Sequence, residues 1–237
     1  KLNKIKLKDK KMIKKCLFPA AGYGTRFLPA TKSIPKEMLP IVNKPLIHYG
    51  IEEANRAGIK EFGFVTGRSK RAIEDYLDFQ PEIEKSIEGS SKEKLLADTT
   101  KMINECTFTY VRQKEMKGLG HAILTGEPLI GNNPFAFILA DDLCEGEVLS
   151  QMVKLYEKFK CSIVAIEEVP KEETSKYGVI AGKEIENGVY MINNMVEKPE
   201  PKNAPSNLAI IGRYILTPDI FDILRKTKPG KGGEIQI

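Results

Sequence analysis

The stretch 16-CLFPAAGYGTRFLPATKSIPKEMLP-40 decides the fold expected for this chain of 237 residues. Residues 16–21 form a short apolar run typical of a buried strand, and Gly22 and Gly24 follow it. Such a loop lets backbone N–H groups approach a phosphate closely, although a Gly-x-Gly turn alone has an equally good steric explanation. A nicotinamide dehydrogenase and a P-loop NTPase are disfavoured, because Phe27 replaces the third glycine of the first motif and no Gly-Lys-Ser/Thr occurs.

The same stretch carries cations on a restrained backbone. Arg26 follows the glycines, and prolines flank both Lys32 and Lys36. Proline fixes φ and so reduces the freedom of a loop, and cations held in place suit a polyphosphate. The alternative, a solvated loop whose lysines bind nothing, is less favoured because of the prolines.

Further along the chain, strand-like and helix-like segments alternate. Strands are expected at 61–66, 108–112 and 135–140, and helices at 45–57, 70–79, 92–104, 120–129 and 148–160. Four more strands are expected at 162–169, 177–185, 189–196 and 208–216. The pattern predicts an α/β fold with a mainly parallel sheet, whose β-rich C-terminal half folds over the sheet to hold a second substrate.

An acidic pair, Asp141-Asp142, follows the most apolar of these strands. Ligands of open α/β sheets bind at the carboxyl ends of the strands, and carboxylates there commonly hold Mg²⁺ against phosphate oxygens. An aspartate that caps the next turn is the alternative. The two interpretations are balanced for Asp142, whereas the metal is favoured for Asp141.

Two later motifs could contact ligands. Gln113 offers an amide that could read a base edge, and Gly118 would leave space for the ring. Glu197 and Lys198 close a strand before Pro199. Neighbouring residues on a strand point to opposite sides, so this pair would bracket a ligand only if the backbone twists there. A plain surface turn is the commoner explanation.

The net charge of +5 belongs to the N-terminus. Residues 1–15 carry eight lysines and one aspartate, which is +7 and leaves −2 for the remainder. No aromatic residue accompanies residues 1–11 to stack on bases, which argues against a nucleic-acid partner. The four cysteines form no Cys-x-x-Cys pair, and no apolar run approaches the length of a membrane span. We therefore expect a cytoplasmic protein with no membrane partner.

Seven blocks, in this order, resemble the bacterial UTP–glucose-1-phosphate uridylyltransferases of the sugar-phosphate nucleotidyltransferase superfamily. The blocks are residues 19–32, 35–40, 117–122, 139–142, 196–199, 204–209 and 233–236. The resemblance runs from residue 13 to 237, and the first block alone would indicate only the superfamily.

The resemblance implies one catalytic domain over residues 12–237 with a Rossmann-like core, preceded by a basic tail at 1–11 that is disordered or added. It implies that UTP and glucose 1-phosphate give UDP-glucose and pyrophosphate with Mg²⁺, in a homodimer or homotetramer. The family pattern continues beyond Ile237 into C-terminal helices and a further aspartate, so its C-terminal end is missing here. A sister enzyme such as a thymidylyltransferase, and a non-catalytic sugar-nucleotide-binding protein, are the alternatives.

The resemblance and the loop chemistry together give the expected site residues, which fall into four groups. The nucleotide is assigned to Ala20, Ala21, Gly22, Gly24, Gln113, Gly118 and Asp142; the catalytic cations are Arg26, Lys36 and Lys198; the metal ligand is Asp141; and glucose 1-phosphate is assigned to Gly178, Glu197 and Lys198.

Overall fold

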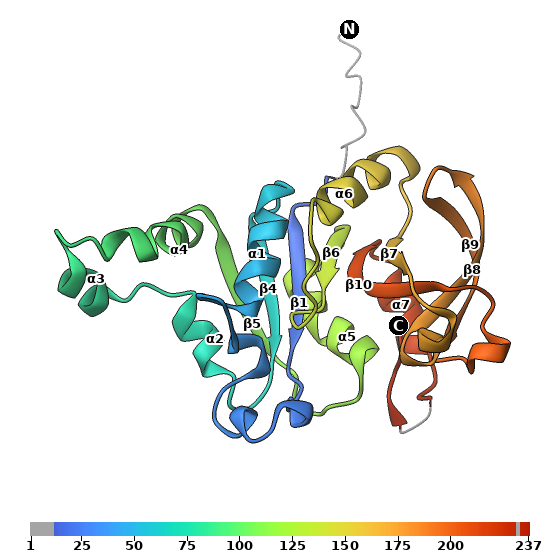
Figure 1. The fold of residues 1–237 in the computed structure, drawn as a ribbon, viewed down its shortest axis with the longest axis horizontal. Coiled ribbons are helices and arrows are strands. Elements are labelled where there is room, and N and C mark those ends of the chain that lie inside the picture. The colour runs from blue at the N-terminus through green and yellow to red at the C-terminus, as the bar shows by residue number, and fades with distance from the viewer. Residues whose placement is uncertain (1–11, 231–232) are drawn as a thin grey trace, which may run out of the picture.

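The computed structural model describes residues 12–230 and 233–237. Within them, one eight-stranded sheet runs through the middle of the molecule, with helices on both faces (Figure 1). Its strand order is β5-β4-β1-β6-β10-β8-β9, and β7 pairs with β10 beside this path. The predicted α/β fold, a mixed sheet flanked by helices with a β-rich C-terminal half, is confirmed.

The N-terminal half of the sheet is parallel. Its strands are β1 (Lys15–Ala20), β4 (Glu61–Thr66), β5 (Thr107–Arg112) and β6 (Phe135–Ile138). β1 lies in the centre, where Leu17 is in register with Gly63 on one side and Phe137 on the other. Because parallel strands end at the same edge, the loops that follow them gather together, at the bottom of Figure 1.

Helices pack an apolar core on each face of the sheet. One face holds α1 (Leu46–Arg56), α2 (Arg71–Tyr76), α4 (Glu93–Glu105) and α6 (Val148–Phe159); the other holds α5 (Leu119–Ile130) and α7 (Ile220–Lys226). On the first face the rings of Phe18 and Phe64 stack at 5.3 Å, and on the second those of Phe135 and Phe221 stack at 5.6 Å. These fully buried rings hold the central strands in a rigid layer.

The C-terminal half is antiparallel. It contains β7 (Ile163–Glu168), β8 (Gly178–Glu186), β9 (Val189–Glu197) and β10 (Leu208–Leu216). β8 and β9 form a hairpin whose turn contains Gly188 at φ +71°. β10 pairs with β6, β7 and β8, so it joins the two halves of the sheet.

Some elements differ from the sequence-based expectation. β6 ends at Ile138, two residues earlier than predicted, because the chain turns there and the N–H of Asp142 donates back to the Leu139 carbonyl at 3.2 Å. The helices α3 (Pro81–Ile87) and α7, and the hairpin of β2 (Pro40–Ile41) and β3 (Lys44–Pro45), were not predicted. No residue of α3 is buried, so it lacks the apolar periodicity that would have revealed it.

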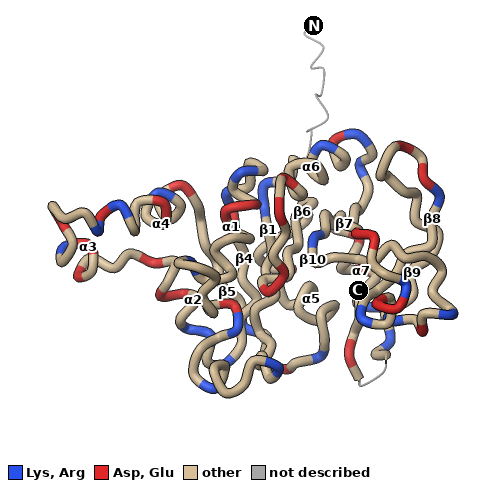
Figure 2. Tube along the Cα trace, viewed as in Figure 1, with Lys and Arg blue, Asp and Glu red and all other residues tan. Residues whose placement is uncertain are grey.

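Charge is intermingled over the described residues. Figure 2 shows both basic and acidic positions along α3, α4 and α6. The predicted basic tail at residues 1–11 lies outside the described residues. None of the helices described here has the length and apolar character that crossing a bilayer requires.

Candidate active site

A cavity of about 340 Å³ opens at the carboxyl edge of the parallel strands. Its walls come from the loops that follow β1, β5 and β6, from the turn that carries Lys36, and from the C-terminal segment. The lining residues are Pro19, Ala21, Gly22, Lys36, Gln113, Met116, Gly118, Leu119, Ala122, Leu139, Asp141 and Glu234. Six of the predicted site residues are therefore brought together here: Ala21, Gly22, Lys36, Gln113, Gly118 and Asp141.

The two glycines of the first loop have different surroundings. A Cβ at Gly22 would meet nothing within 4 Å, so this part of the loop leaves its backbone open toward the cavity. Gly24 has φ +68°, and a Cβ there would lie 3.1 Å from Cβ of Lys36. Thr31 also donates to the Gly24 carbonyl at 2.7 Å. Gly24 thus packs the loop against the Lys36 turn, and it does not line the cavity.

Lys36 and Asp141 form an ion pair at the cavity wall. The Lys36 ammonium donates to Oδ2 of Asp141 at 2.6 Å, and both side chains are about four-fifths buried. A cation and a carboxylate in contact can separate to receive an anionic phosphate and a metal ion. In the part of the chain that the structure describes, no cluster of three or more ligating side chains occurs. One carboxylate with open space beside it suits Mg²⁺, which takes most of its oxygen ligands from water and phosphate.

A buried ion pair anchors the turn that carries Lys36. Glu37, fully buried, accepts a hydrogen bond from the Lys70 ammonium at 2.7 Å, and Lys70 itself is buried. Burial raises the pKa of the Glu37 carboxyl, and Lys70 opposes that rise. Neighbouring residues of the turn, Lys36 and Glu37, therefore point respectively toward the cavity and into the protein. This pair was not predicted, because its only signal in the sequence is an acid among prolines.

Gln113 is held by a histidine. Its main-chain N–H donates to the Thr66 carbonyl at 2.8 Å, which places it directly after β5. Its side-chain Nε2 lies 2.8 Å from Nδ1 of His121 on α5, and only 5% of Gln113 is exposed. His121 thus fixes the orientation of the amide at the cavity wall. This role of His121 was not predicted from the sequence.

The structure gives a further reason for the glycine at position 118, besides the space for a base ring that the sequence predicts. A Cβ there would lie 2.8 Å from Cβ of Glu234 and 2.9 Å from the Ile235 carbonyl oxygen. The N–H of Gly120 donates to the Ile235 carbonyl, and the N–H of Ile235 donates to the Lys117 carbonyl, both at 2.8 Å. The two glycines therefore make room for the C-terminal segment, which in turn brings Glu234 to the cavity.

The residues predicted to hold the sugar phosphate meet at the end of the β8–β9 hairpin. Gly178 and Glu197 are in register, and a Cβ at Gly178 would lie 3.2 Å from Oε2 of Glu197. Lys198 has φ +46°, and its ammonium lies 3.2 Å from Oε1 of Glu197. Its N–H donates to the Tyr177 carbonyl at 3.0 Å. The backbone twist that the two side chains need in order to share one side is therefore present.

Tyr214 on β10 interacts electrostatically both with this cluster and with the acidic loop, which is the turn that carries Asp141 and Asp142. Burial, together with the negative charges of Asp142 and Glu197, raises the pKa of Tyr214 to about 12. Its ring packs on Phe137 of β6 at 5.7 Å. The acidic loop and the hairpin end thus lie within electrostatic range of the same phenol.

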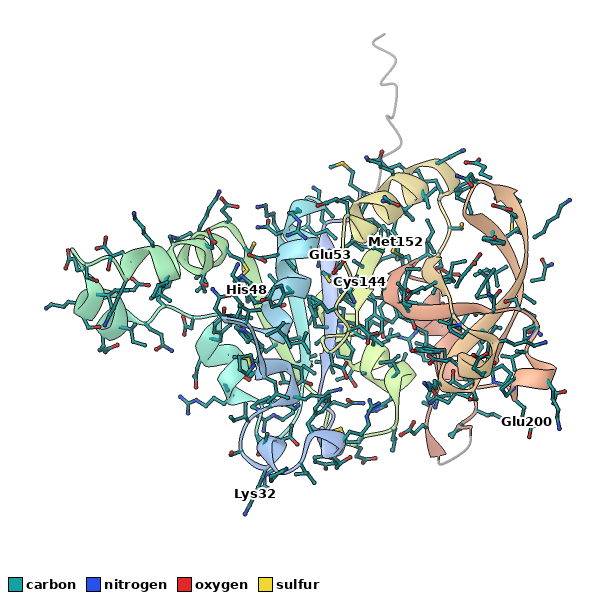
Figure 3. The ribbon with its side chains drawn as sticks, in the orientation of Figure 1. Lys32, His48, Glu53, Cys144, Met152 and Glu200 are labelled. Atoms are coloured by element: carbon teal, nitrogen blue, oxygen red, sulfur yellow. The ribbon has the colours of Figure 1, made fainter. Side chains whose placement is uncertain are left out.

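The remaining predicted residues do not line the cavity. Ala20 is buried at the end of β1, and Arg26 lies exposed in a short 3₁₀ turn, Thr25–Phe27. Figure 3 shows Lys32 directed away from the protein body. Asp142 packs its carboxylate over β10, where a Cβ at Gly212 would collide with it. Removal from water raises the pKa of Asp142, and repulsion from Asp141 raises it further.

The chain as a whole is similar to known proteins. The model of the family described as nucleotidyl transferase matches residues 17–237. A UTP–glucose-1-phosphate uridylyltransferase of Pseudomonas aeruginosa PAO1 is 68% identical over 230 residues, which are 95% of this chain and 82% of the relative. A crystal structure of apo UDP-glucose pyrophosphorylase is 67% identical with a TM-score of 0.92, and one complexed with UDP-glucose is 64% identical with a TM-score of 0.88. Each covers 95% of this chain and 84% of the solved chain.

Proposed function

The chain belongs to the nucleotidyl transferase family, and from this we propose that it transfers the uridylyl group of UTP to glucose 1-phosphate, giving UDP-glucose and pyrophosphate. The resemblance seen in the seven sequence blocks is confirmed by the relatives. The observation that carries the proposal is the Lys36–Asp141 pair at the wall of the cavity, in a fold shared with a UDP-glucose complex.

The nucleotide occupies the cavity in this proposal. The open backbone of Ala21 and Gly22 lies against the uridine, and Gln113 pairs with the edge of the base. With Nε2 of Gln113 turned to His121, its amide oxygen is suited to accept from the N3–H of uracil, a donor that cytosine lacks. The hydrogen bond to His121 thereby becomes part of base recognition.

The reaction requires positioning and charge neutralisation more than acid–base chemistry. A phosphate oxygen of glucose 1-phosphate attacks the α-phosphorus of UTP in line, a new P–O bond forms, and pyrophosphate leaves. Lys36 turns from Asp141 toward the triphosphate, and Arg26, which lies outside the cavity wall, is assigned to assist it from the exposed turn Thr25–Phe27. Asp141 would hold Mg²⁺, which neutralises phosphate charge when bound.

The hairpin end receives glucose 1-phosphate. We assign the sugar hydroxyls to Glu197 and the phosphate to Lys198, since a carboxylate accepts from hydroxyls and an ammonium pairs with a phosphate. Gly178 allows the Glu197 carboxylate to lie flat against β8. The contact between Glu197 and Lys198 keeps both groups on one side.

Lys198→Ala is expected to raise the KM for glucose 1-phosphate about tenfold or more, with a smaller change in the KM for UTP. An exposed ammonium that pairs with one substrate contributes mainly to the binding of that substrate. Steady-state kinetics with each substrate varied in turn measure both constants. Equal changes in the two KM values would show that Lys198 does not bind glucose 1-phosphate in particular. Lys202→Ala, in the following turn Pro201–Asn203, is the matched control and should leave both KM values unchanged.

The function is tested by pyrophosphate release from each nucleoside triphosphate with glucose 1-phosphate. UTP is expected to support turnover with a divalent cation, and dTTP, CTP, ATP and GTP far less. A preference for dTTP would indicate the sister thymidylyltransferase instead. Absence of turnover with every nucleotide, in a protein that still binds UDP-glucose, would indicate a binding protein.

Three further expectations remain predictions. We propose that residues 12–237 form one catalytic domain, to be checked by limited proteolysis. We propose a cytoplasmic location, supported by the four free cysteines. We also propose a homodimer or homotetramer that binds no nucleic acid, and sedimentation velocity measures its mass.

A further inference from the structure

A buried arginine lies behind the acidic loop. Arg213 on β10 is only 1% exposed, and its Nε donates to Oε2 of Glu53 at 2.9 Å. Glu53 belongs to α1 and is 4% exposed. Figure 3 labels Glu53 in the middle of the molecule, beside Cys144 of the chain that follows the acidic pair. The charged pair thus connects β10 to a helix 160 residues away in sequence.

The same guanidinium holds the acidic loop. Its Nη2 donates to the main-chain carbonyl of Asp142 at 3.0 Å. The loop is also tied to β10 where Leu139 donates to Gly212 at 2.8 Å, and it closes on itself where the N–H of Asp142 donates to the Leu139 carbonyl at 3.2 Å. Asp141 lies between these contacts, so the backbone on either side of its carboxylate is fixed from behind.

Glu53 extends this network to the far end of the loop. Its second oxygen, Oε1, accepts from the N–H of Leu149 in the first turn of α6 at 3.2 Å. The segment from β6 to α6 is therefore held near its start by Arg213 and at its end by Glu53. Two side chains that contact each other thus fix both ends of one loop.

Stability alone does not account for such a pair. Burying two charges costs solvation free energy, and neutral residues of similar volume are often as stabilising. A guanidinium, however, directs several donors in a fixed plane, which allows Arg213 to orient a carboxylate and a carbonyl at the same time. A metal-binding carboxylate needs support of this kind, because its geometry must be held within a fraction of an ångström.

We propose that Arg213, oriented by Glu53, is a positioning residue that holds the Asp141 carboxylate in place for a divalent cation. This rests on the proposed function, which assigns the cation to Asp141. Arg213 does not touch substrate; it acts through the Asp142 carbonyl and the loop backbone. The network also joins the nucleotide half of the sheet to β10, which leads toward the sugar-phosphate residues.

The test measures cation binding apart from turnover. Mn²⁺, a paramagnetic substitute for Mg²⁺, is titrated into the protein with UTP and followed by electron paramagnetic resonance, while urea unfolding reports stability. Arg213→Met leaves Glu53 unpaired, and we expect it to lower both stability and Mn²⁺ affinity. The double variant Glu53→Gln/Arg213→Met removes both charges. We expect it to regain most of the stability while its Mn²⁺ affinity stays about tenfold or more below wild type.

A second variant covers the case in which the double variant does not fold. Arg213→Lys keeps a positive charge beside Glu53, but one ammonium cannot reach both acceptors in the same geometry, so Mn²⁺ affinity is again expected to fall about tenfold. Arg225→Met, which removes an arginine from the exposed pair with Glu127, should bind Mn²⁺ as wild type does.

Three results would count against the inference. Wild-type Mn²⁺ affinity in a folded Arg213→Lys protein would overturn it and leave the proposed function standing. Recovery of Mn²⁺ affinity together with stability in the double variant would do the same, because Arg213 would then act through stability alone. A wild-type protein that binds no Mn²⁺ in the presence of UTP would overturn the cation site itself, and with it this inference.

Discussion

Lys36→Ala is expected to lower kcat by on the order of 10²-fold or more, the largest effect of any single lysine. The ammonium lies at the cavity wall, and its attraction to phosphate grows as charge moves onto the leaving pyrophosphate. An interaction that strengthens in the transition state affects kcat more than KM. Single-turnover and steady-state kinetics with UTP and glucose 1-phosphate measure this loss.

A lysine outside the site provides the control for Lys36. Lys60 pairs with Glu105 at the opposite edge of the sheet, so Lys60→Ala should keep wild-type kinetics. The melting temperature of Lys36→Ala is measured alongside the kinetics, because the largely buried Asp141 carboxylate loses its partner and a loss of folding must be separated from a loss of catalysis. A kcat within threefold of wild type in a folded Lys36→Ala protein would show that this ammonium does not serve the reaction.

Asp141→Asn is expected to remove most of the cation-dependent activity, again by on the order of 10²-fold or more. Asparagine keeps the size of the side chain and one carbonyl oxygen but loses the charge that attracts a divalent cation. The substitution also leaves Lys36 without its carboxylate partner. Turnover should then require much higher Mg²⁺, and Mn²⁺ titration should show a parallel loss of affinity.

The comparison for Asp141 is an exposed aspartate on the projecting helix α4. Asp98 has a side chain that is 77% exposed, so Asp98→Asn should leave the Mg²⁺ dependence unchanged. If Asp141→Asn retained the wild-type Mg²⁺ dependence, the cation would have to be held elsewhere. Asp142, whose carboxylate packs over Gly212, would be the next residue to test.

Local pattern was sufficient to predict most of the architecture. The apolar runs around Phe64 and Phe137 identify buried strands, and the glycines after β1 mark the edge where ligands bind. Patterns of this kind involve residues that are close together in the sequence, so they can be recognised in one sequence without an alignment. The helix α3 escaped prediction because its residues face solvent and carry no apolar period.

The support around the site could not be predicted, because it is made of contacts between distant residues. The hydrogen bond from Arg213 to Glu53, and that from Lys70 to Glu37, join segments that no short pattern relates. The contact of Gly118 with the C-terminal segment around Glu234 is of the same kind, because more than 100 residues separate the two positions. Six of the residues that line the cavity were predicted from the sequence, whereas the contacts that support them are seen only in the structure.

The left-handed backbone of Lys198 is expected to lower the stability of the protein, although the proposed reaction uses the lysine side chain. A residue other than glycine at φ +46° is strained by about 1 kcal/mol. Lys198→Gly is therefore expected to raise the free energy of unfolding by up to about 1 kcal/mol while it loses the sugar-phosphate contact, as urea unfolding and kinetics would show. Val42→Gly, at φ +60° on an exposed turn, should relieve similar strain without loss of activity. Equal activity of the Lys198→Gly and Val42→Gly variants would show that the reaction does not need the Lys198 side chain. With both expected results, position 198 would be one at which glycine gives the more stable protein and lysine the more active one.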